Sequence, residues 1–377
     1  MAIDPIQLTK QLVDIDSTTY HEGACGEFVA EFLAGEGWSV ERQPVPQPDR
    51  AKTPGGGEGP RFNVYAAISG ETGSGETGSG ETGPGETGRG EMGVGKAGKD
   101  VAPEVVFSTH MDTVPPFLGP CREDGEFLYG RGVCDAKGIM AAQIMAAGRL
   151  REQGVRVGLL FVVGEERDSA GAKVANEQPR GSRFLINGEP TDNRLAVASK
   201  GCLRVELYAK GRMAHSAYPE LGESAIDKLL GALKDIQALK LPVVEGIGDT
   251  TLNVGLVSGG RAPNVVADRA EAHLLVRLVG PAKRIREEIV NAVAGRCEVD
   301  FSLELPFVQM RAVEGFETMV AKFTTDVPSL TNWGEPFLLG PGSIHVAHTP
   351  EERIAKRELL EAVELYVKLA RRLVKAA

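Results

Sequence analysis

Residues 105–115 read Val-Val-Phe-Ser-Thr-His-Met-Asp-Thr-Val-Pro, an apolar run of strand length that ends in His110 and Asp112. Side chains two residues apart on a strand point to the same side, so this strand would present an imidazole and a carboxylate together. Imidazole is a common metal ligand, and a neighbouring carboxylate can fix its tautomer and raise its basicity. The pair also occurs by chance at solvated strand ends, so its meaning depends on the rest of the chain.

The elements around this strand predict an α/β fold. A helix is expected at about residues 137–153, followed by apolar strands at 159–163 and 183–187. Continuous apolar strands are typical of a sheet that is covered on both faces. Ligand-type residues follow these strands, at the edge where open α/β sheets place their sites. Further expected elements are helices at 5–14 and 24–34, strands at 38–41 and 63–68, and a terminal helix from about residue 357.

Residues 197–303 differ in character from the rest of the chain. The expected strands there are 201–210, 250–257, 266–278 and 297–304, and the expected helices are 223–239 and 281–294. This βαββαβ order is the ferredoxin-like arrangement, and it predicts a second domain inserted into the first. We therefore divide the chain into a catalytic domain of residues 1–196 and 304–377 and an inserted domain of residues 197–303.

A short Gly-Glu-Thr repeat begins at Gly70 and contains no apolar residue. Such a segment cannot bury enough surface to offset the entropy of ordering it. Glycine does not stand at every third position, which excludes a collagen helix. We predict a flexible loop over residues 69–100 without a catalytic role, and a surface-binding role is the alternative.

Length and charge restrict the classes of partner. The chain has 377 residues, enough for two cores, and a formal net charge of −10. This charge argues against nucleic acid and anionic membranes as partners, although a metal site can still bind anionic substrates. The first residues lack the regions of a signal peptide, and the five cysteines show no CxxC spacing. These features predict a cytoplasmic protein with reduced thiols.

Four further segments carry ligand-type residues, and each has an ordinary structural alternative. Asp135 follows a glycine-rich loop directly before a helix, where it could equally be the helix N-cap. Glu165 and Glu166 follow a buried strand, so one could bind metal while its neighbour moves a proton. The alternative for this pair is a solvated acidic turn. Glu189 also fits a surface turn, and His348 also fits the start of a helix.

Together these segments resemble the M20 metallopeptidase family, in particular its acetylornithine deacetylase and succinyl-diaminopimelate desuccinylase group. The resemblance rests on HMDTVP, GRGVCDAKG, GEE, GEP, HSAYP and AHTPEE, which occur in the family's order over nearly the whole chain. It implies a mixed-sheet α/β/α metallohydrolase domain with an inserted ferredoxin-like domain that serves as lid and dimerisation domain. The repeat at residues 69–100 departs from the family pattern but interrupts no motif.

The resemblance also implies a site with two divalent metal ions. Its ligands would be His110, Asp135, Glu166, Glu189 and His348. Asp135 would bridge the ions, with His110 and Glu189 on one and Glu166 and His348 on the other. Three protein ligands on each ion leave a position for water. Nitrogen and oxygen donors favour zinc, with cobalt or manganese as substitutes.

The same resemblance implies roles in catalysis. Glu165 would activate a metal-bridging water and pass its proton to the leaving amine, and Asp112 would orient His110. His215 would donate a hydrogen bond to the oxyanion, from the partner subunit of a homodimer formed through the inserted domain. Without the resemblance, a lone loop histidine such as His215 is more often structural.

Substrate-side positions implied by the resemblance are Asn264, Arg277, Gly342 and Ser343. A guanidinium is suited to clamping a carboxylate with two parallel hydrogen bonds. For Arg277 an ion pair at a strand end is an equal alternative.

The resemblance therefore implies a metal-dependent hydrolase of linear amides that acts on an N-acyl amino acid or a short peptide. Acetylornithine deacetylase, an enzyme of amino-acid biosynthesis, is the expected activity. Succinyl-diaminopimelate desuccinylase and metallo-carboxypeptidase or dipeptidase are alternatives, because a few pocket side chains set the preference. The alternative from a different functional class is a related protein that binds metal but has no catalytic activity. It would lack a ligand or the base, and this chain lacks neither.

Overall fold

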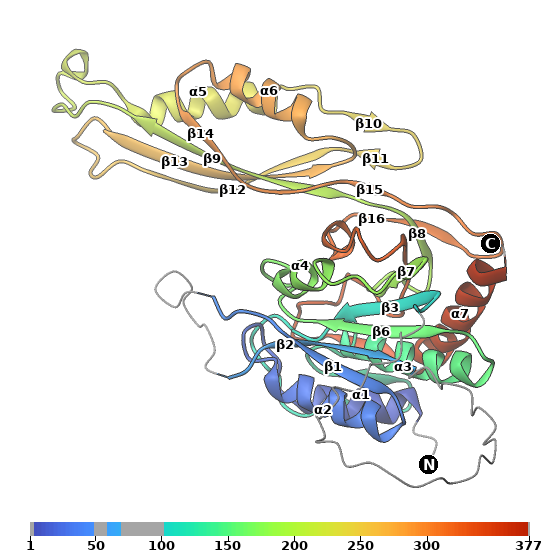
Figure 1. Cartoon of the computed structure of the whole chain (residues 1–377). Coiled ribbons are helices and arrows are strands. Elements are labelled where there is room, and N and C mark those ends of the chain that lie inside the picture. Colours follow the sequence, from blue (N-terminus) through green and yellow to red (C-terminus); the bar gives the residue numbers. More distant parts are fainter. Residues whose placement is uncertain (1–3, 49–58, 69–101, 376–377) are drawn as a thin grey trace, which may run out of the picture.

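The structure is a computed structural model, and it describes residues 4–48, 59–68 and 102–375. The loop predicted at residues 69–100 lies outside the described residues. Figure 1 shows two sheets, one above the other. Two connections join them, from β8 (Leu195–Ser199) to β9 (Gly201–Lys210) and from β14 (Glu298–Leu305) to β15 (Val308–Gln309). Among the described helices, none is both long and apolar enough to cross a membrane.

The larger sheet contains nine strands. Besides β8 and β15, they are β1 (Ser39–Pro44), β2 (Phe62–Ala67), β3 (Val105–His110), β6 (Val157–Val162), β7 (Phe184–Asn187), β16 (Thr318–Ala321) and β17 (Glu335–Leu338). Their order is β1-β2-β6-β3-β7-β17-β8-β15, and β16 pairs with β8. The central strands β6, β3, β7 and β17 are parallel, and β1, β2 and β15 pair antiparallel with their neighbours. The sheet is therefore mixed, and its central carboxyl ends meet at one edge.

Helices cover both faces of this sheet. One face is covered by α1 (Pro5–Val13), α2 (Gly23–Gly35), α3 (Lys137–Glu152) and α7 (Lys356–Lys375), and the other by α4 (Ala170–Asn176). Along β3, Val105 and Phe107 belong to the first core, whereas Val106 packs with Trp333 in the second. Side chains alternate along a strand, so both faces of β3 are buried. The continuous apolar run in the sequence predicted this burial.

The second sheet has the order β12-β13-β9-β14, and all of its pairs are antiparallel. Its remaining strands are β12 (Thr251–Gly259) and β13 (Arg269–Leu278), and a hairpin of β10 (Val243–Val244) and β11 (Gly248–Asp249) lies beside it. Two helices, α5 (Ala225–Gln237) and α6 (Lys283–Val293), share a separate hydrophobic core with this sheet. This is the ferredoxin-like strand order. The exact domain boundaries stay a prediction.

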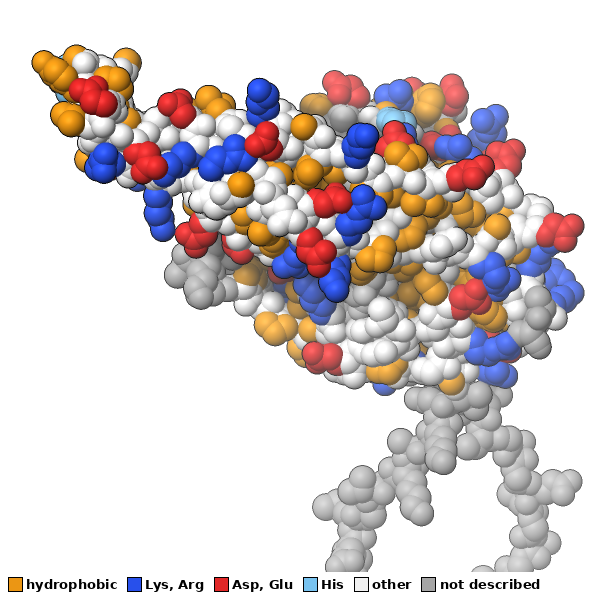
Figure 2. Space-filling model, turned by 90° about the horizontal axis from the view of Figure 1, so that it is seen from above, with side chains coloured by type: hydrophobic (Ala, Val, Ile, Leu, Met, Phe, Trp, Pro, Cys, Tyr) orange, Lys and Arg blue, Asp and Glu red, His pale blue; other side chains and the backbone are white. Residues whose placement is uncertain are grey.

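The helices α5 and α6 lie above the second sheet, so its open face is turned towards the larger sheet (Figure 1). Figure 2 shows the molecule from the side of these helices, with acidic and basic side chains interspersed over the face. Mixed charges produce no extended basic field on this face.

The predicted helices and strands are present within a few residues of their expected bounds. Short elements were not predicted, namely β8, β10, β11, β15, β16, β17, α4, the small sheet of β4 (Arg122–Glu123), β5 (Phe127–Tyr129) and β18 (Arg353–Ala355), and the 3-10 helices η1 (Pro219–Leu221) and η2 (Val327–Ser329). Pro336 lies inside β17, and proline normally argues against a strand. Pairing with neighbouring strands, rather than local preference, stabilises the short strands.

Candidate active site

The carboxyl end of β3 brings the first two predicted ligands together. His110 is the last residue of β3 and is 1% exposed, and its Nε2 lies 3.0 Å from Oδ1 of Asp135. Asp135 precedes α3, but the N-cap position of α3 is Ala136, which makes no side-chain cap. The alternative that Asp135 caps the helix is therefore wrong, and its carboxylate faces the imidazole.

His348 joins the same group from a distant part of the chain. Its Nε2 lies 2.9 Å from Oε1 of Glu166 and 3.2 Å from Oδ2 of Asp135. His348 lies in a turn, and α7 begins only at Lys356, so the helix-start alternative is wrong. Asp135 thus presents one oxygen to each histidine. Ligand atoms of His110, Asp135 and Glu166 lie within 4.8 Å of one another, and such donors could hold a metal ion.

Two more carboxylates adjoin this group. Glu189 follows β7 and is 4% exposed, and its Oε1 is buried without a hydrogen-bond partner among the described residues. Glu165 and Glu166 lie in a turn after β6, which Gly164 opens at φ +81°, rather than on the strand itself. Burial raises the pKa of Glu165 and Glu189 well above the ordinary value, and Glu189 adds to the shift at Glu165.

The carboxylate of Asp112 holds this turn. Its Oδ1 accepts hydrogen bonds from the amides of Gly164 at 2.8 Å and Glu165 at 3.1 Å, and its Oδ2 accepts one from the amide of Glu166 at 3.3 Å. The Nδ1 atom of His110 lies 2.8 Å from the carbonyl oxygen of Asp112 and 3.7 Å from its Oδ1. Asp112 therefore orients His110 through its backbone, while its side chain positions the two glutamates.

The site carries a surplus of buried negative charge. Hydrogen bonds to Asp135 and Glu166 raise the pKa of His348 to about 10. Burial raises the pKa of Asp326 to about 6, and this carboxylate in turn raises the pKa of Glu165. The sequence did not single out Asp326, because Thr-Thr-Asp-Val-Pro looks like an ordinary turn. A concentration of buried carboxylates favours the binding of a cation.

The loop with Gly342 and Ser343 lies beside this cluster. Ser343 pairs with Thr191, two residues after Glu189, and its carbonyl oxygen accepts a hydrogen bond from Sγ of Cys134 at 3.3 Å. Cys134 directly precedes Asp135 in the chain. The structure thus places both loop residues next to segments that carry predicted ligands.

Arg277 lies near the connection between the two sheets. It pairs with Cys202 at the start of β9, and its side chain is half-buried. Among the described residues, the Arg277 guanidinium has neither a hydrogen bond nor an ion pair. The described residues therefore do not support the alternative that Arg277 forms a surface ion pair.

His215 lies in the loop between β9 and α5, and Asn264 lies in the loop between β12 and β13. Both loops are at the end of the second sheet that is far from the connection of β8 and β9 (Figure 1). His215 forms a bridge with Val265, and its Nδ1 accepts a hydrogen bond from the amide of Ala217 at 3.1 Å. The carbonyl oxygen of Asn264 accepts one from the amide of Ser216. Within one described chain, none of these contacts reaches the cluster at the larger sheet.

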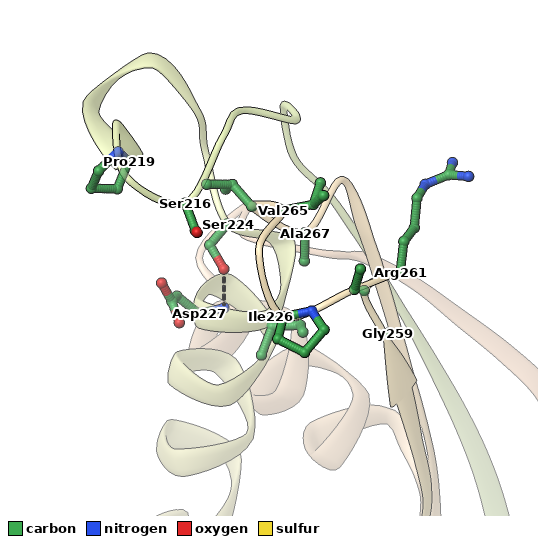
Figure 3. A pocket seen from close by; sticks show the side chains of 13 residues that line it. Ser216, Pro219, Ser224, Ile226, Asp227, Gly259, Arg261, Val265 and Ala267 are labelled. Carbon is green, nitrogen blue, oxygen red and sulfur yellow. Dashed lines mark hydrogen bonds between the residues drawn. The ribbon is translucent and has the colours of Figure 1, made fainter.

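A hollow of about 710 Å³ adjoins the same two loops. Its lining includes Ser216 and Val265 from the loops and Ser224 from the start of α5 (Figure 3). The Ser224 hydroxyl accepts a hydrogen bond from the amide of Asp227 and thereby caps the helix. The hollow is separate from the cluster of histidines and carboxylates.

Comparisons with known proteins agree with this fold. The model of peptidase family M20/M25/M40 matches residues 106–372. A probable carboxypeptidase of Aspergillus terreus is 37% identical to this chain over 396 residues, which cover 96% of this chain and 84% of that protein. This chain belongs to peptidase family M20/M25/M40, and it is a metal-dependent hydrolase of amides.

Solved structures share the fold. Aminopeptidase PepT of Bacillus cereus superimposes with a TM-score of 0.72 at 20% identity, over 98% of each chain. A dinuclear metal binding peptidase of the M20 family from Bacillus subtilis superimposes with a TM-score of 0.65 at 16% identity, over 99% of this chain and 98% of that chain. At these identities the likeness concerns the fold alone.

Proposed function

We propose that this chain hydrolyses the amide bond that joins an acyl group or an amino acid to a C-terminal amino acid with a free carboxylate. The observation that carries the proposal is the meeting of His110, Asp135, Glu166 and His348 beside Glu165 at one edge of the larger sheet. The Aspergillus relative named a probable carboxypeptidase supports this choice of bond. Carboxypeptidase, dipeptidase and N-acyl-amino-acid deacylase reactions all cleave it.

The residues fit a pair of divalent metal ions. Asp135 presents one oxygen to each histidine, as a bridging ligand must. The orphaned, buried Oε1 of Glu189 would gain a cationic partner, which offsets the cost of burying it. On this assignment His110 and Glu189 would hold one ion, and Glu166 and His348 would hold the other. Zinc suits these donors, and cobalt or manganese could replace it.

The mechanism assigns one task to each side chain. Bound divalent ions supply Lewis acidity towards the amide carbonyl and the attacking water. Glu165 takes a proton from that water as its oxygen bonds to the carbonyl carbon, and delivers the proton to the amine nitrogen as the C–N bond breaks. Asp112 keeps Glu165 in place through the backbone of its turn.

The oxyanion donor is assigned to His215 of a second copy of this chain, because His215 does not reach the cluster within one chain. A homodimer through the second sheet has a suitable surface. The strand β12 is an open edge at which Leu256 and Val257 are 65% and 56% exposed. Met213 and Tyr218, in the His215 loop, are also exposed apolar side chains. Asn264 would approach the substrate from the same loop pair.

Arg277 would bind the C-terminal carboxylate of the substrate. Its guanidinium lies near the connection between the sheets, and it has no acidic partner among the described residues. Gly342 and Ser343 would border the substrate on the other side. Acetylornithine deacetylation remains a candidate within this class, because the GPGS loop and the AHTPEE segment resemble that group.

Hydrolysis by the zinc- or cobalt-reconstituted protein tests the proposal. The substrates are an N-blocked dipeptide, a free dipeptide, N-acetyl-ornithine and N-succinyl-diaminopimelate, each also as its C-terminal amide. We expect turnover of at least one free acid, loss of turnover on chelation, and a large preference over the matching amide. The absence of turnover on all of them, with two metal equivalents bound, would contradict the proposed reaction.

A further inference from the structure

We propose that Glu352, paired with Arg131, is a positioning residue that holds the loop carrying Asp135 against the loop carrying His348. This inference rests on the proposed function, because it takes Asp135 and His348 as metal ligands. Neither Glu352 nor Arg131 is one of the proposed metal ligands. Their side chains act by hydrogen bonding to the backbone of the two loops that carry Asp135 and His348.

One oxygen of Glu352 fixes the backbone of the Asp135 loop. The Glu352 side chain is 0% exposed, and its Oε1 accepts hydrogen bonds from the amides of Gly132 at 2.8 Å, Cys134 at 3.2 Å and Asp135 at 3.3 Å. The carbonyl oxygen of Glu352 also accepts one from the amide of Gly130 at 3.2 Å. The loop is thus held along its length, up to the residue whose carboxylate lies between the two histidines.

The other oxygen of Glu352 ties Arg131 to the His348 segment. The Arg131 side chain is 3% exposed, and its Nη1 donates to Oε2 of Glu352 at 2.6 Å. The same Nη1 donates to the carbonyl oxygen of Thr349 at 3.4 Å. Thr349 directly follows His348, so Arg131 contacts the segment 349–352 at both of its ends.

The His348 segment needs such support. His348 has a φ of +64°, in the left-handed region that is unfavourable for residues other than glycine, and its side chain is 48% exposed. Few packing contacts can therefore fix its imidazole. The hydrogen bonds of Glu352 and Arg131 supply the missing restraint, and they keep Nε2 of His348 within 3.2 Å of Asp135.

The experiment must separate positioning from the cost of an unpaired buried charge. Removing Glu352 alone would leave Arg131 buried without a counter-ion, which destabilises a protein for reasons unrelated to metal. The variants therefore share the Arg131→Met background. In R131M/E352Q the amide oxygen can still accept from the three loop amides, whereas R131M/E352A offers no acceptor. Leu33→Ala, a core change in α2, is the control for general destabilisation.

The readouts are the cobalt content, the dissociation constants from cobalt titration, and the visible absorption spectrum of bound cobalt, with the Tm of each metal-free protein. We expect two cobalt ions and the wild-type spectrum for wild type and Leu33→Ala. R131M/E352Q keeps an acceptor for the loop amides but loses the contact of Arg131 with Thr349, so we expect it to bind cobalt more weakly than wild type and more tightly than R131M/E352A. For R131M/E352A we expect affinity lower by about 10- to 100-fold, the usual effect of losing a partner that orients a ligand, and a changed spectrum.

Wild-type affinity and spectrum in R131M/E352A would overturn the inference, and so would equal losses in the two double variants. If R131M/E352A does not fold, Glu352→Asp gives the test, because it keeps the charge but shortens the reach by one methylene. Weaker cobalt binding by Glu352→Asp supports the inference, and unchanged binding overturns it. Failure of the wild type itself to bind cobalt would instead contradict the proposed function.

Discussion

The edge of the larger sheet and the far end of the second sheet both carry residues with predicted catalytic roles, but they hold them differently. At the larger sheet, His110, Asp135 and Glu189 are buried, and the charged groups lie next to one another. At the second sheet, His215 and Asn264 are exposed in loops, and their hydrogen bonds are local.

This difference shows which part of the proposed site is formed within one chain. Buried carboxylates and imidazoles are stable only when each has a partner, so their clustering marks a site that folding of one chain assembles. Exposed loop residues need no partner inside their own chain. Their proposed roles require a second molecule that supplies the rest of the site. The following predictions are ordered by their expected effect on turnover.

The largest effect is expected for Glu165→Ala. Losing the general base should lower kcat by about 10²- to 10⁴-fold, whereas metal content should stay near that of the wild type. Steady-state kinetics and metal analysis check this. Asp135→Asn is the matched comparison and should lose metal together with activity. Loss of metal in Glu165→Ala as well would show that Glu165 is a ligand rather than the base.

A smaller loss, of about 10²- to 10³-fold in kcat, is expected for His215→Ala, which removes an oxyanion donor. Mixing His215→Ala with Glu165→Ala should restore about a quarter of the wild-type activity, because half of the randomly formed dimers contain one complete site. His273→Ala, a histidine of β13 outside the loops, is the control and should remain active. No recovery on mixing would argue against a shared site.

Arg277→Met should raise KM by about 10- to 100-fold with little change in kcat, because a hydrogen bond to a charged group contributes about 1.5–3 kcal/mol. The effect should disappear for substrates whose C-terminus is an amide. Arg204→Met is the control, since Arg204 lies on β9 opposite Leu275, next to the Cys202–Arg277 pair. Equal effects of the two changes would indicate a general role of charge rather than a carboxylate clamp.

The smallest effect on the metal site is expected for Leu229→Ala. Leu229 is buried in the separate core of the second sheet, and its truncation should cost about 2–5 kcal/mol of unfolding free energy. Cobalt affinity should not change, because this core shares no side chain with the core of the larger sheet. Calorimetry and cobalt titration measure the two quantities. A change in cobalt affinity would mean that the two sheets are coupled.

Much of the fold could be predicted because long elements carry strong patterns. The strand expected at residues 201–210 coincides with β9, and the apolar run that begins at Val105 contains β3. By contrast, β17 has four residues and contains Pro336, so its sequence favours a turn. It forms a strand because β7 and β8 lie on either side and satisfy its backbone.

The sequence by itself determined which residues could act as ligands and base only through the resemblance of its motifs to the M20 family, because each motif alone also fits an ordinary turn or helix end. Only the tertiary structure excluded the helix cap for Asp135 and placed its carboxylate beside His110. It also showed that the Asp112 carboxylate holds a turn 52 residues away, and that Glu352 holds a loop 217 residues away. Hydrogen bonds over such separations depend on how the chain crosses the sheet, and no local pattern encodes that crossing.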